Sequence, residues 1–372
     1  MKRIAMLSPY APSYREGIYT LMDKALKLDW YFCGDAKRPL KLLDYSCLNN
    51  CNLDLQEKYL FAGIDYYKGF DQIDFDQYDY LIIAGVIRCI TEWRVLFRYA
   101  NKKRGPKVFL WTHGFYGYEG FLQGSIKKFF YKKADGLFLY GNYAKEALIR
   151  EGIDAKKLHV IHNSLDYDVQ LKLRESIKPS SVYTDHFGNN NPTIVFIGRL
   201  TKVKKLDQLV EAVSKLKTEK GENYNIVFVG DGEERVSLEA TVTKHNLQEQ
   251  VWFYGACFDE KTNAELVYNA DLCVAPGNIG LTAMHVLMFG CPAMSHNDFK
   301  MQMPEFESIK PSVTGDFFNY NDVDDMAAHI SQWFADKKEH REEVRQACYK
   351  EIDESWNPYF QVNLIKKVFE LD

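Results

Sequence analysis

The sequence predicts an α/β protein of two domains, each built on a parallel sheet with helices on both faces. The chain has 372 residues, of which 46% are hydrophobic and 26% charged, enough for two domains that each bury a core. Short apolar runs bounded by turn residues alternate with helical patterns along the chain, and this alternation is typical of parallel sheets. A polar, turn-rich stretch near the middle separates two such series.

The first series defines an N-terminal domain over residues 1–176. Its apolar runs predict buried strands at 3–7, 80–84, 107–111, 136–140 and 159–162. Apolar residues recur at helical spacing in 18–28 and 143–151, which we expect to be helices. Residues 177–191 contain serine and asparagine clusters and predict a linker.

The second series defines a C-terminal domain over residues 192–354. We expect strands at 193–197, 225–229, 251–254, 272–275 and 293–295, and helices at 206–216, 233–245 and 281–289. Ligands of such domains bind beyond the carboxyl ends of the strands. The strand-to-helix turns are therefore where chemistry is expected.

Charge is divided unevenly between the two halves. The net charge is −4, which argues against a nucleic-acid partner, because nucleic-acid-binding domains carry a strong basic excess. Residues 1–150 hold 23 Lys and Arg against 16 Asp and Glu, a net of +7, whereas residues 151–372 hold 24 against 35, a net of −11. The basic first half indicates that one domain faces something anionic.

The sequence predicts a cytoplasmic protein. The first strand follows residue 3 directly, without the longer apolar stretch and cleavage site of a secretory signal. The longest stretch free of Asp, Glu, Lys and Arg, 272–297, holds several glycines and prolines, which a membrane span tolerates poorly. The eight cysteines form no Cys-x-x-Cys pair, which is typical of reduced thiols.

A cationic turn follows the first strand of the C-terminal domain. The strand ends at Gly198, and Arg199, Lys202, Lys204 and Lys205 crowd the turn before the next helix. The Arg fork matches phosphate oxygens and Lys adds a mobile charge. A solvated basic loop would explain the charges as well. Such a loop does not require Gly-Arg directly after a buried strand, and for this reason the pattern favours anion binding.

A second turn carries a potential helix N-terminus. In Ala275-Pro-Gly-Asn-Ile-Gly-Leu-Thr-Ala-Met-His-Val-Leu-Met-Phe-Gly-Cys-Pro292 a strand enters a glycine-containing turn and then an apolar helix. Gly280 allows a close backbone approach, and the amides of Gly280, Leu281 and Thr282 lie where a helix start binds anions. Alone this signal is weak, since most α/β domains have glycines in such turns.

Taken in order, these segments resemble retaining glycosyltransferases of the GT-B fold, specifically glycosyltransferase family 4. Gly198-Arg-Leu-x-Lys-x-Lys204 is similar to the family's turn whose Arg and last Lys hold the donor diphosphate. The resemblance covers residues 192–330, and its further matches are Val229-Gly-Asp-Gly232, 251–255 beside the nucleobase, 280–292, Pro304-Glu305 and Thr314-Gly315.

The resemblance implies two Rossmann-like domains with a cleft between them, and a C-terminal segment, 355–372, that returns as a helix to the first domain. It implies retaining, metal-independent transfer of a hexosyl group from a UDP- or GDP-sugar, without a cofactor, to a glycan or lipid-linked saccharide. A role in bacterial surface polysaccharide or lipopolysaccharide biosynthesis is an inference from this type of enzyme. A sugar-nucleotide 2-epimerase of the same fold and a non-catalytic nucleotide- or glycan-binding relative stay open.

Two departures fall on the family's Glu-x7-Glu pair, which binds the donor sugar and the ribose. These positions hold Gly277 and His285. His285 could bond a ribose hydroxyl or a phosphate through a ring nitrogen, and Asn278 could serve the sugar. A helix-face histidine in an inactive relative is the other interpretation. The site residues implied for the donor are Gly17, Gly198, Gly277, Asn278, Gly280, Leu281, Thr282, His285 and Tyr254.

The N-terminal half resembles the family only loosely. Arg199, Lys204 and His113, a histidine after a clear strand, are the implied catalytic residues, and His113 is expected next to the reacting sugar. Tyr116, Tyr118 and Glu119 follow it and could line the acceptor side, with Glu119 a candidate base. Neither Asp-x-Asp pair, at 74–76 and 166–168, has a convincing metal context, so no metal site is expected.

Residues 126–133 interleave lysines with aromatic residues. On a helix this pattern offers apolar bulk and charge for an anionic membrane, which predicts peripheral contact with the inner face of the cytoplasmic membrane. A core helix with solvated lysines (Lys127, Lys128, Lys132 and Lys133) explains the pattern equally well.

Overall fold

The computed structural model describes residues 2–36 and 41–371, and these form two compact units. Unit 1 takes in the chain up to Tyr167 and the segment from Asn357 onward, and unit 2 is Asp168–Trp356. The first boundary therefore lies at Tyr167 rather than at the expected residue 176. The C-terminal segment belongs to unit 1 from Asn357, close to the expected start at 355.

Unit 1 contains a mixed sheet with the order β4-β3-β2-β1-β5-β6-β7-β8 among the described residues. Neighbouring strands run parallel except β3 and β4, which are antiparallel. The three strands β2 to β4 were not predicted, and β3 in particular is largely exposed and polar. The strands are β1 Ile4–Ser8, β2 Asp29–Cys33, β3 Asn50–Tyr59, β4 Asp65–Lys68, β5 Tyr80–Ile83, β6 Lys107–Thr112, β7 Gly136–Leu139 and β8 Leu158–Val160.

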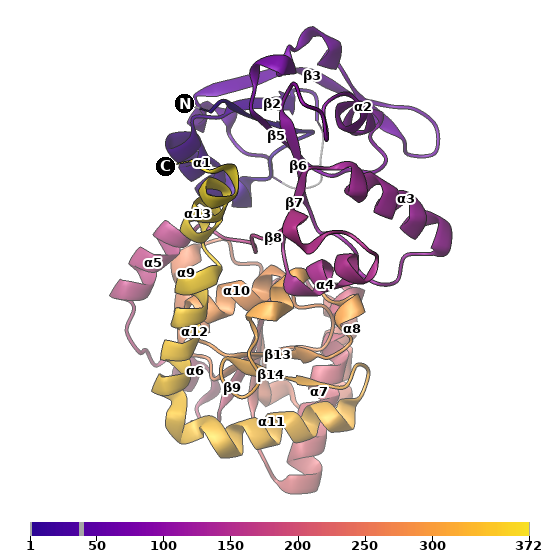
Figure 1. Ribbon diagram of the computed structural model, residues 1–372. Helices are drawn as coiled ribbons and strands as arrows, with labels where there is room; N and C mark the ends of the chain where they lie inside the picture. The colour runs from indigo at the N-terminus through magenta and orange to yellow at the C-terminus, as the bar shows by residue number, and fades with distance from the viewer. Residues whose placement is uncertain (1, 37–40, 372) are drawn as a thin grey trace. The chain divides into compact units, whose positions relative to one another are not determined.

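Helices cover this sheet, and the last of them comes from the end of the chain. Helix α13 lies beside α1 (Figure 1). The ring of Phe369 stacks on Tyr80 of β5 with 4.0 Å between centroids, and its carbonyl accepts a 2.8 Å hydrogen bond from Lys2 Nζ. The helices are α1 Glu16–Leu26, α2 Ile90–Arg98, α3 Phe121–Lys133, α4 Asn142–Arg150 and α13 Pro358–Phe369.

Unit 2 contains a parallel sheet with the order β11-β10-β9-β12-β13-β14 over the described part of the chain. This is the strand order of the dinucleotide-binding Rossmann fold, whose ligands bind where the order reverses. Here the order reverses between β9 and β12. The strands are β9 Thr193–Ile197, β10 Asn225–Val229, β11 Val251–Gly255, β12 Leu272–Ala275, β13 Ala293–His296 and β14 Gly315–Phe318.

The helices of unit 2 include one inside the expected linker. Residues 177–191 are not simply a linker, because α6 forms there and buries Tyr183, whose hydroxyl donates a 2.6 Å hydrogen bond to the carbonyl of Leu266. The helices are α5 Tyr167–Ser176, α6 Val182–Phe187, α7 Leu206–Lys215, α8 Arg235–Lys244, α9 Glu260–Asn269, α10 Leu281–Met288, α11 Val323–Lys337 and α12 Arg341–Ser355.

Two global features bear on the expectations from sequence. Within the described residues, no helix has both the length and the apolar composition needed to cross a lipid bilayer. The eight cysteines are free thiols.

Candidate functional site

The cationic turn of unit 2 starts at the carboxyl end of β9, at the point where the strand order reverses. Gly198 adopts φ +148°, and the backbone of the next turn packs directly on it, since a Cβ at Gly230 would lie 1.9 Å from the Gly198 carbonyl oxygen. Arg199 follows on the surface, and its guanidinium has no hydrogen-bond or ion-pair partner among the described residues. The turn therefore presents an unpaired cation at the edge where ligands of this fold bind.

Lys204 joins this turn to the turn after β12. Its Nζ donates hydrogen bonds to the carbonyl oxygen of Asn278 at 2.6 Å and to the Asn278 side-chain oxygen at 2.8 Å. The amide of Gly277 donates in return to the Lys204 carbonyl at 2.9 Å. The structure thus brings three of the residues implied for the donor into one cluster.

The contact at Gly277 explains one departure from the family pattern. A Cβ at Gly277 would lie 1.9 Å from the carbonyl oxygen of Val203 and 2.7 Å from the Lys204 Cα. The backbone of the first turn occupies the space that a side chain would need. Gly277 can therefore offer a ligand only its backbone, and no carboxylate fits at this position.

Burial and neighbouring charge tune Lys204. Burial, reinforced by the Arg199 guanidinium and opposed by the buried carboxylate of Glu305, lowers the pKa of Lys204 to about 8. An ammonium with this pKa is still largely charged at neutral pH. The neighbouring negative charge does not fully compensate for its burial and for the positive charge of Arg199. An anionic ligand at the turn would supply the missing negative charge.

Lys205 is also a cation of the turn, but its side chain points toward Asn321 and Tyr320. Its ammonium contacts the side-chain oxygen of Asn321 and lies 4.1 Å from the ring centroid of Tyr320. Its backbone has φ +51°, a conformation that glycine adopts more readily. Lys205 therefore closes the turn and adds less to its cationic face than the sequence indicated.

Helix α10 begins beside this cluster. Gly280 precedes it with φ +55°, and Thr282 anchors its first turn by donating a 2.8 Å hydrogen bond to the carbonyl of Ile197 at the end of β9. The first amides of a helix have no intrahelical acceptor, and the helix dipole makes this end attractive to anions. The amides of Leu281 and Thr282 are therefore placed to bind a phosphate close to Arg199.

A buried polar network, which the sequence did not reveal, holds the loop before α10. Gln302 accepts a 3.0 Å hydrogen bond from the Ile279 amide and donates to Ser295 Oγ at 2.8 Å. Ser295 in turn donates to the carbonyls of Ala275 and Gly277. Both side chains are fully or nearly fully buried. No local pattern marks such residues, because their partners lie on other elements.

His285 lies on α10 and contacts a carboxylate from another helix. Its Nε2 is 2.9 Å from Oε1 of Glu260, the first residue of α9, and Gln170 Nε2 donates to the same oxygen at 2.8 Å. Burial alone would raise the pKa of Glu260, but the hydrogen bonds from His285 and Gln170 hold it below its ordinary value. His285 is therefore neither solvated nor isolated. Glu260 was not predicted as a site residue.

Tyr254 is on the edge strand β11, which one strand separates from β9. Its ring centroid is 5.1 Å from that of Trp252, and Trp252 stacks on His186 of α6 at 3.8 Å. Tyr254 thus belongs to an aromatic stack on the side of α6.

Unit 1 has its own cluster at the carboxyl edge of its sheet. His113 follows β6, and its ring lies 4.6 Å from that of Tyr140. Burial first, and then the charges of Arg15 and Lys127, lower the pKa of His113 to about 4. The imidazole is therefore neutral at pH 7 and can act as a hydrogen-bonding group but not as a cation.

Arg15 is a further site candidate, which no motif of the sequence marks. Its guanidinium carbon lies 5.3 Å from the ring centroids of both Trp111 and Tyr140, and no carboxylate pairs with it in the described part of unit 1. It comes two residues before Gly17, which lies in the first turn of α1. A signal existed in the sequence, since Arg15 is the one charged residue between the first strand, which ends at Ser8, and the helix that begins at Glu16.

Both carboxylate oxygens of Glu119, the candidate base, accept hydrogen bonds within unit 1. Its Oε1 accepts hydrogen bonds from the Tyr116 amide at 2.9 Å and from Lys127 Nζ at 2.8 Å, and its Oε2 accepts from the Gly117 amide at 2.8 Å. Burial would raise the pKa of Glu119, but Lys127 and these amides hold it below its ordinary value. Glu119 fixes the loop after His113, and of the expected acceptor-side residues Tyr118 is the exposed one.

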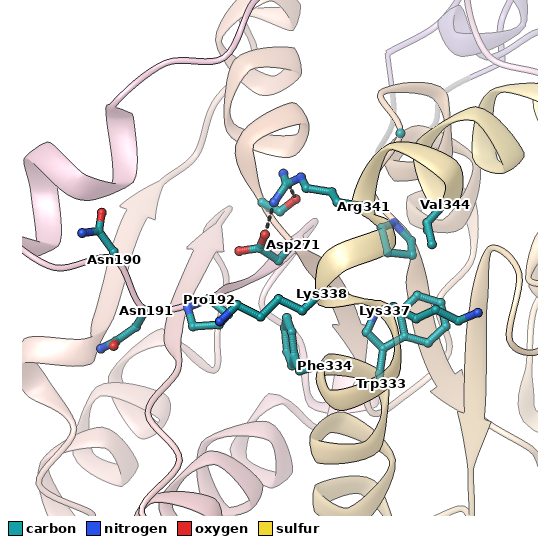
Figure 2. A pocket seen from close by; sticks show the side chains of 13 residues that line it. Asn190, Asn191, Pro192, Asp271, Trp333, Phe334, Lys337, Lys338, Arg341 and Val344 are labelled. Carbon is teal, nitrogen blue, oxygen red and sulfur yellow. Dashed lines mark hydrogen bonds and ion pairs between the residues drawn. The ribbon is translucent and has the colours of Figure 1, made fainter.

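A pocket of about 140 Å³ lies at the opposite, amino-terminal edge of the unit 2 sheet (Figure 2). It is lined by Pro192, Asp271 and Pro292, which directly precede β9, β12 and β13. Arg341 in its wall donates to Asp271 and to two backbone carbonyls. The pocket lies at the amino-terminal edge of the sheet, whereas the donor residues follow the carboxyl ends of its strands. The pocket is therefore separate from the donor residues.

The structure offers no cluster of metal ligands in residues 2–36 and 41–371: no three His, Cys, Asp or Glu side chains are grouped so that they could hold an ion. Of the Asp-x-Asp pairs, Asp74 accepts a hydrogen bond from the Asp76 amide, and Asp76 forms an ion pair with Arg98 at 3.7 Å.

Comparison with known proteins agrees with this geometry. Residues 185–351 match the family model described as glycosyl transferases group 1. A curated relative, the 2-deoxystreptamine glucosyltransferase of Streptomyces kanamyceticus, is 23% identical over 181 residues, which are 46% of this chain and 45% of the relative. The chain thus matches slightly less than half the length of this relative.

Solved structures match over nearly the whole chain. The lipopolysaccharide outer core galactosyltransferase WaaB has a TM-score of 0.68 at 16% identity, covering 99% of both chains. HepE of Anabaena, crystallised with UDP, has a TM-score of 0.70 at 15% identity and the same coverage. A glycosyltransferase of Rickettsia africae has a TM-score of 0.73 at 15% identity, covering 99% of this chain and 98% of its own.

The sheets of both units, the strand order of unit 2 and these matches establish the fold class that the sequence predicted. The chain has the GT-B fold of two Rossmann-like domains, and its residues 185–351 are similar to the family glycosyl transferases group 1.

Proposed function

We propose that this protein is a retaining, metal-independent hexosyltransferase of glycosyltransferase family 4 that uses a UDP- or GDP-sugar as donor. The observation that carries the proposal is the cluster at the switch point of unit 2. There Arg199 and Lys204 lie on the turn after β9, hydrogen bonds tie this turn and β9 to the start of α10, and no carboxylate neutralises Arg199 among the described residues. A solved structure of similar fold holds UDP-glucose.

The chemistry follows from where negative charge develops. When the bond from the anomeric carbon to the diphosphate breaks, charge grows on the departing nucleoside diphosphate. Arg199, Lys204 and the α10 amides stabilise it, and fixed donors of this kind supply the largest part of catalysis in many enzymes. These cations would take the place of a divalent metal, so the proposal includes no cofactor.

Retention requires the acceptor to attack from the face that the diphosphate leaves. A diphosphate oxygen can then take the proton from the acceptor hydroxyl, and no protein base is needed. This fits Glu119, whose oxygens are already bonded to Lys127 and to backbone amides. His113, neutral at pH 7, would orient a sugar hydroxyl, and Arg15 adds positive charge to the same edge of unit 1.

We propose a glycan or lipid-linked saccharide as acceptor and a role in bacterial surface polysaccharide biosynthesis at the inner face of the cytoplasmic membrane. The outer face of α2 and α3 supports membrane contact, because it exposes large apolar side chains beside cations. Phe121 is 93% exposed, and Lys133 Nζ lies 5.2 Å and 5.3 Å from the ring centroids of Phe97 and Phe129. Such faces bind anionic bilayers.

The membrane proposal has a direct test. Phe121→Ser/Lys133→Ser should reduce co-sedimentation with liposomes containing anionic lipid, and added salt should reduce it further. The double variant Glu119→Leu/Lys127→Met serves as the contrast, because the Lys127 ammonium is buried against Glu119 and cannot reach a bilayer. Co-sedimentation that does not depend on lipid charge and is unchanged in both variants would contradict the proposed membrane contact of unit 1.

One experiment tests the activity itself. The purified chain is incubated with UDP-, GDP- and dTDP-sugars, and slow hydrolysis of the donor and its thermal shift are followed. A transferase should bind and slowly hydrolyse one donor class. Isomerisation of a UDP-sugar without an acceptor would indicate a 2-epimerase. Binding without turnover would indicate a non-catalytic relative, the alternative that the absence of carboxylates at Gly277 and His285 suggests.

A further inference from the structure

Glu260 is a partly exposed carboxylate of unit 2 that other helices hold in place. It is the first residue of α9, its side chain is 33% exposed, and two side-chain donors from other helices fix it in place. His285 of α10 and Gln170 of α5 both reach the same oxygen, Oε1, and Asn263 of α9 also donates a hydrogen bond to the carboxylate. A carboxylate held this way is rigid and still accessible from solvent.

The carboxylate is joined through His285 to α10, the helix whose first amides form part of the proposed phosphate position. His285 follows Leu281 by four residues, so the two share one face of α10 and are separated by about 6 Å along its axis. Side chains on a helix lean toward its N-terminus, which brings the imidazole and its partner Glu260 toward the phosphate-binding end. In a nucleoside diphosphate the ribose is the group attached directly to the phosphates.

We infer that Glu260 accepts hydrogen bonds from the ribose hydroxyls of the bound nucleoside diphosphate, with His285 and Gln170 as positioning residues that hold its carboxylate. An acidic side chain accepts the ribose hydroxyls in other nucleotide-binding α/β domains. The inference rests on the proposed function, since it assigns the nucleoside part of the same donor site.

The loop before α9 supplies a second observation. Phe258, two residues before Glu260, is 96% exposed, so its ring is free to contact a ligand. Aromatic rings stack on any nucleobase without needing a particular sequence of donors and acceptors. Phe258 therefore offers a platform for the base next to the carboxylate that holds the ribose.

Equilibrium binding to the full chain tests the assignment with three kinds of probe: UDP or GDP, their 2′-deoxy counterparts, and inorganic pyrophosphate. The wild type should bind the ribonucleotide about 10- to 100-fold more tightly than its deoxy counterpart, as expected for a hydrogen bond to a charged group. Glu260→Ala should lose this discrimination while its affinity for pyrophosphate stays unchanged. Phe258→Ala should weaken both nucleotides alike and leave pyrophosphate unaffected.

Two controls separate the inference from a general loss of structure. Glu265→Ala removes an equal charge from the same helix and should keep the discrimination. His285→Gln, whose amide can donate to Glu260, should preserve most of the preference for the ribose, whereas His285→Ala should reduce it. A purely structural histidine would affect thermal stability in both variants without altering the ratio of the two affinities.

The outcomes distinguish the two proposals. Arg199-dependent binding of a ribonucleotide with discrimination unchanged in Glu260→Ala would overturn the role of Glu260 and leave the proposed function standing. Failure of the wild type to bind any of the nucleotides or pyrophosphate would overturn both.

Discussion

Lys204 Nζ donates hydrogen bonds to both the backbone and the side-chain oxygen of Asn278, at 2.6 Å and 2.8 Å. Two turns that are 74 residues apart in sequence are thereby tied together at the switch point of unit 2. The bond satisfies the ammonium only with neutral oxygens. Its positive charge therefore stays available to a ligand, and this links the local structure to the proposed diphosphate site.

The first prediction concerns the pH dependence of donor use. The pKa of Lys204 is lowered to about 8, so its ammonium is charged below this pH and loses its proton above it. We expect kcat/KM for the donor to fall as the pH rises through about 8, with the slope of one proton. Lys204→Arg, which stays charged, should be less active but should lack this alkaline limb.

A matched control for this experiment is Lys205→Arg, since the Lys205 ammonium contacts Asn321 and Tyr320 instead. Its pH profile should equal that of the wild type. An alkaline limb that persists unchanged in Lys204→Arg would mean that another group causes it.

The second prediction concerns Gly277. Because a Cβ there would lie 1.9 Å from the Val203 carbonyl, Gly277→Ala should lower the free energy of unfolding by about 1–3 kcal/mol, the range for overpacking a tight contact. Urea denaturation measures this, with Gly120→Ala as the control, since a Cβ at Gly120 meets nothing within 4 Å. Gly277→Glu should not raise turnover, and a stable, more active Gly277→Glu would contradict this account.

The third prediction separates structure from catalysis at Glu119. Glu119→Ala leaves the buried Lys127 ammonium unpaired and should cost about 3–5 kcal/mol of stability. The double variant Glu119→Leu/Lys127→Met removes both charges and should recover much of this loss. If the double variant is stable yet inactive at every pH, Glu119 is the base after all. We expect it to retain measurable turnover, because the diphosphate takes the proton.

The sequence predicted the parts of this protein that are marked locally. Strand β9 and the cationic turn were visible because a buried apolar run ends at Gly198, and α10 because Gly280 and Gly290 bracket an apolar segment. The residues it did not reveal depend on distant partners: Glu260 meets His285 and Gln170 only after α5, α9 and α10 have packed. The sequence predicts a linker where the helix around Tyr183 forms, because polar residues flank this helix on both sides.

The type of a residue and its neighbours in sequence do not show whether its side chain faces a ligand or holds the fold together. Glu119 follows a strand-end histidine among aromatic residues, as an acid or base might, yet its oxygens fix a loop. Lys127 belongs to a basic run on α3, yet its ammonium is buried in the pair with Glu119. Gln302 carries no local signal at all, because its function is to bond the backbone amide of a residue 23 positions away.

Turnover of the donor by Arg199→Ala and Lys204→Ala tests the central claim most directly, namely that this cluster stabilises the departing diphosphate. Each substitution should lower kcat by about 100-fold or more, the loss typical of removing one preorganised donor. Lys202→Ala, an exposed cation of the same turn, should stay near the wild type. Near-wild-type turnover in both Arg199→Ala and Lys204→Ala would contradict the assignment of the donor site.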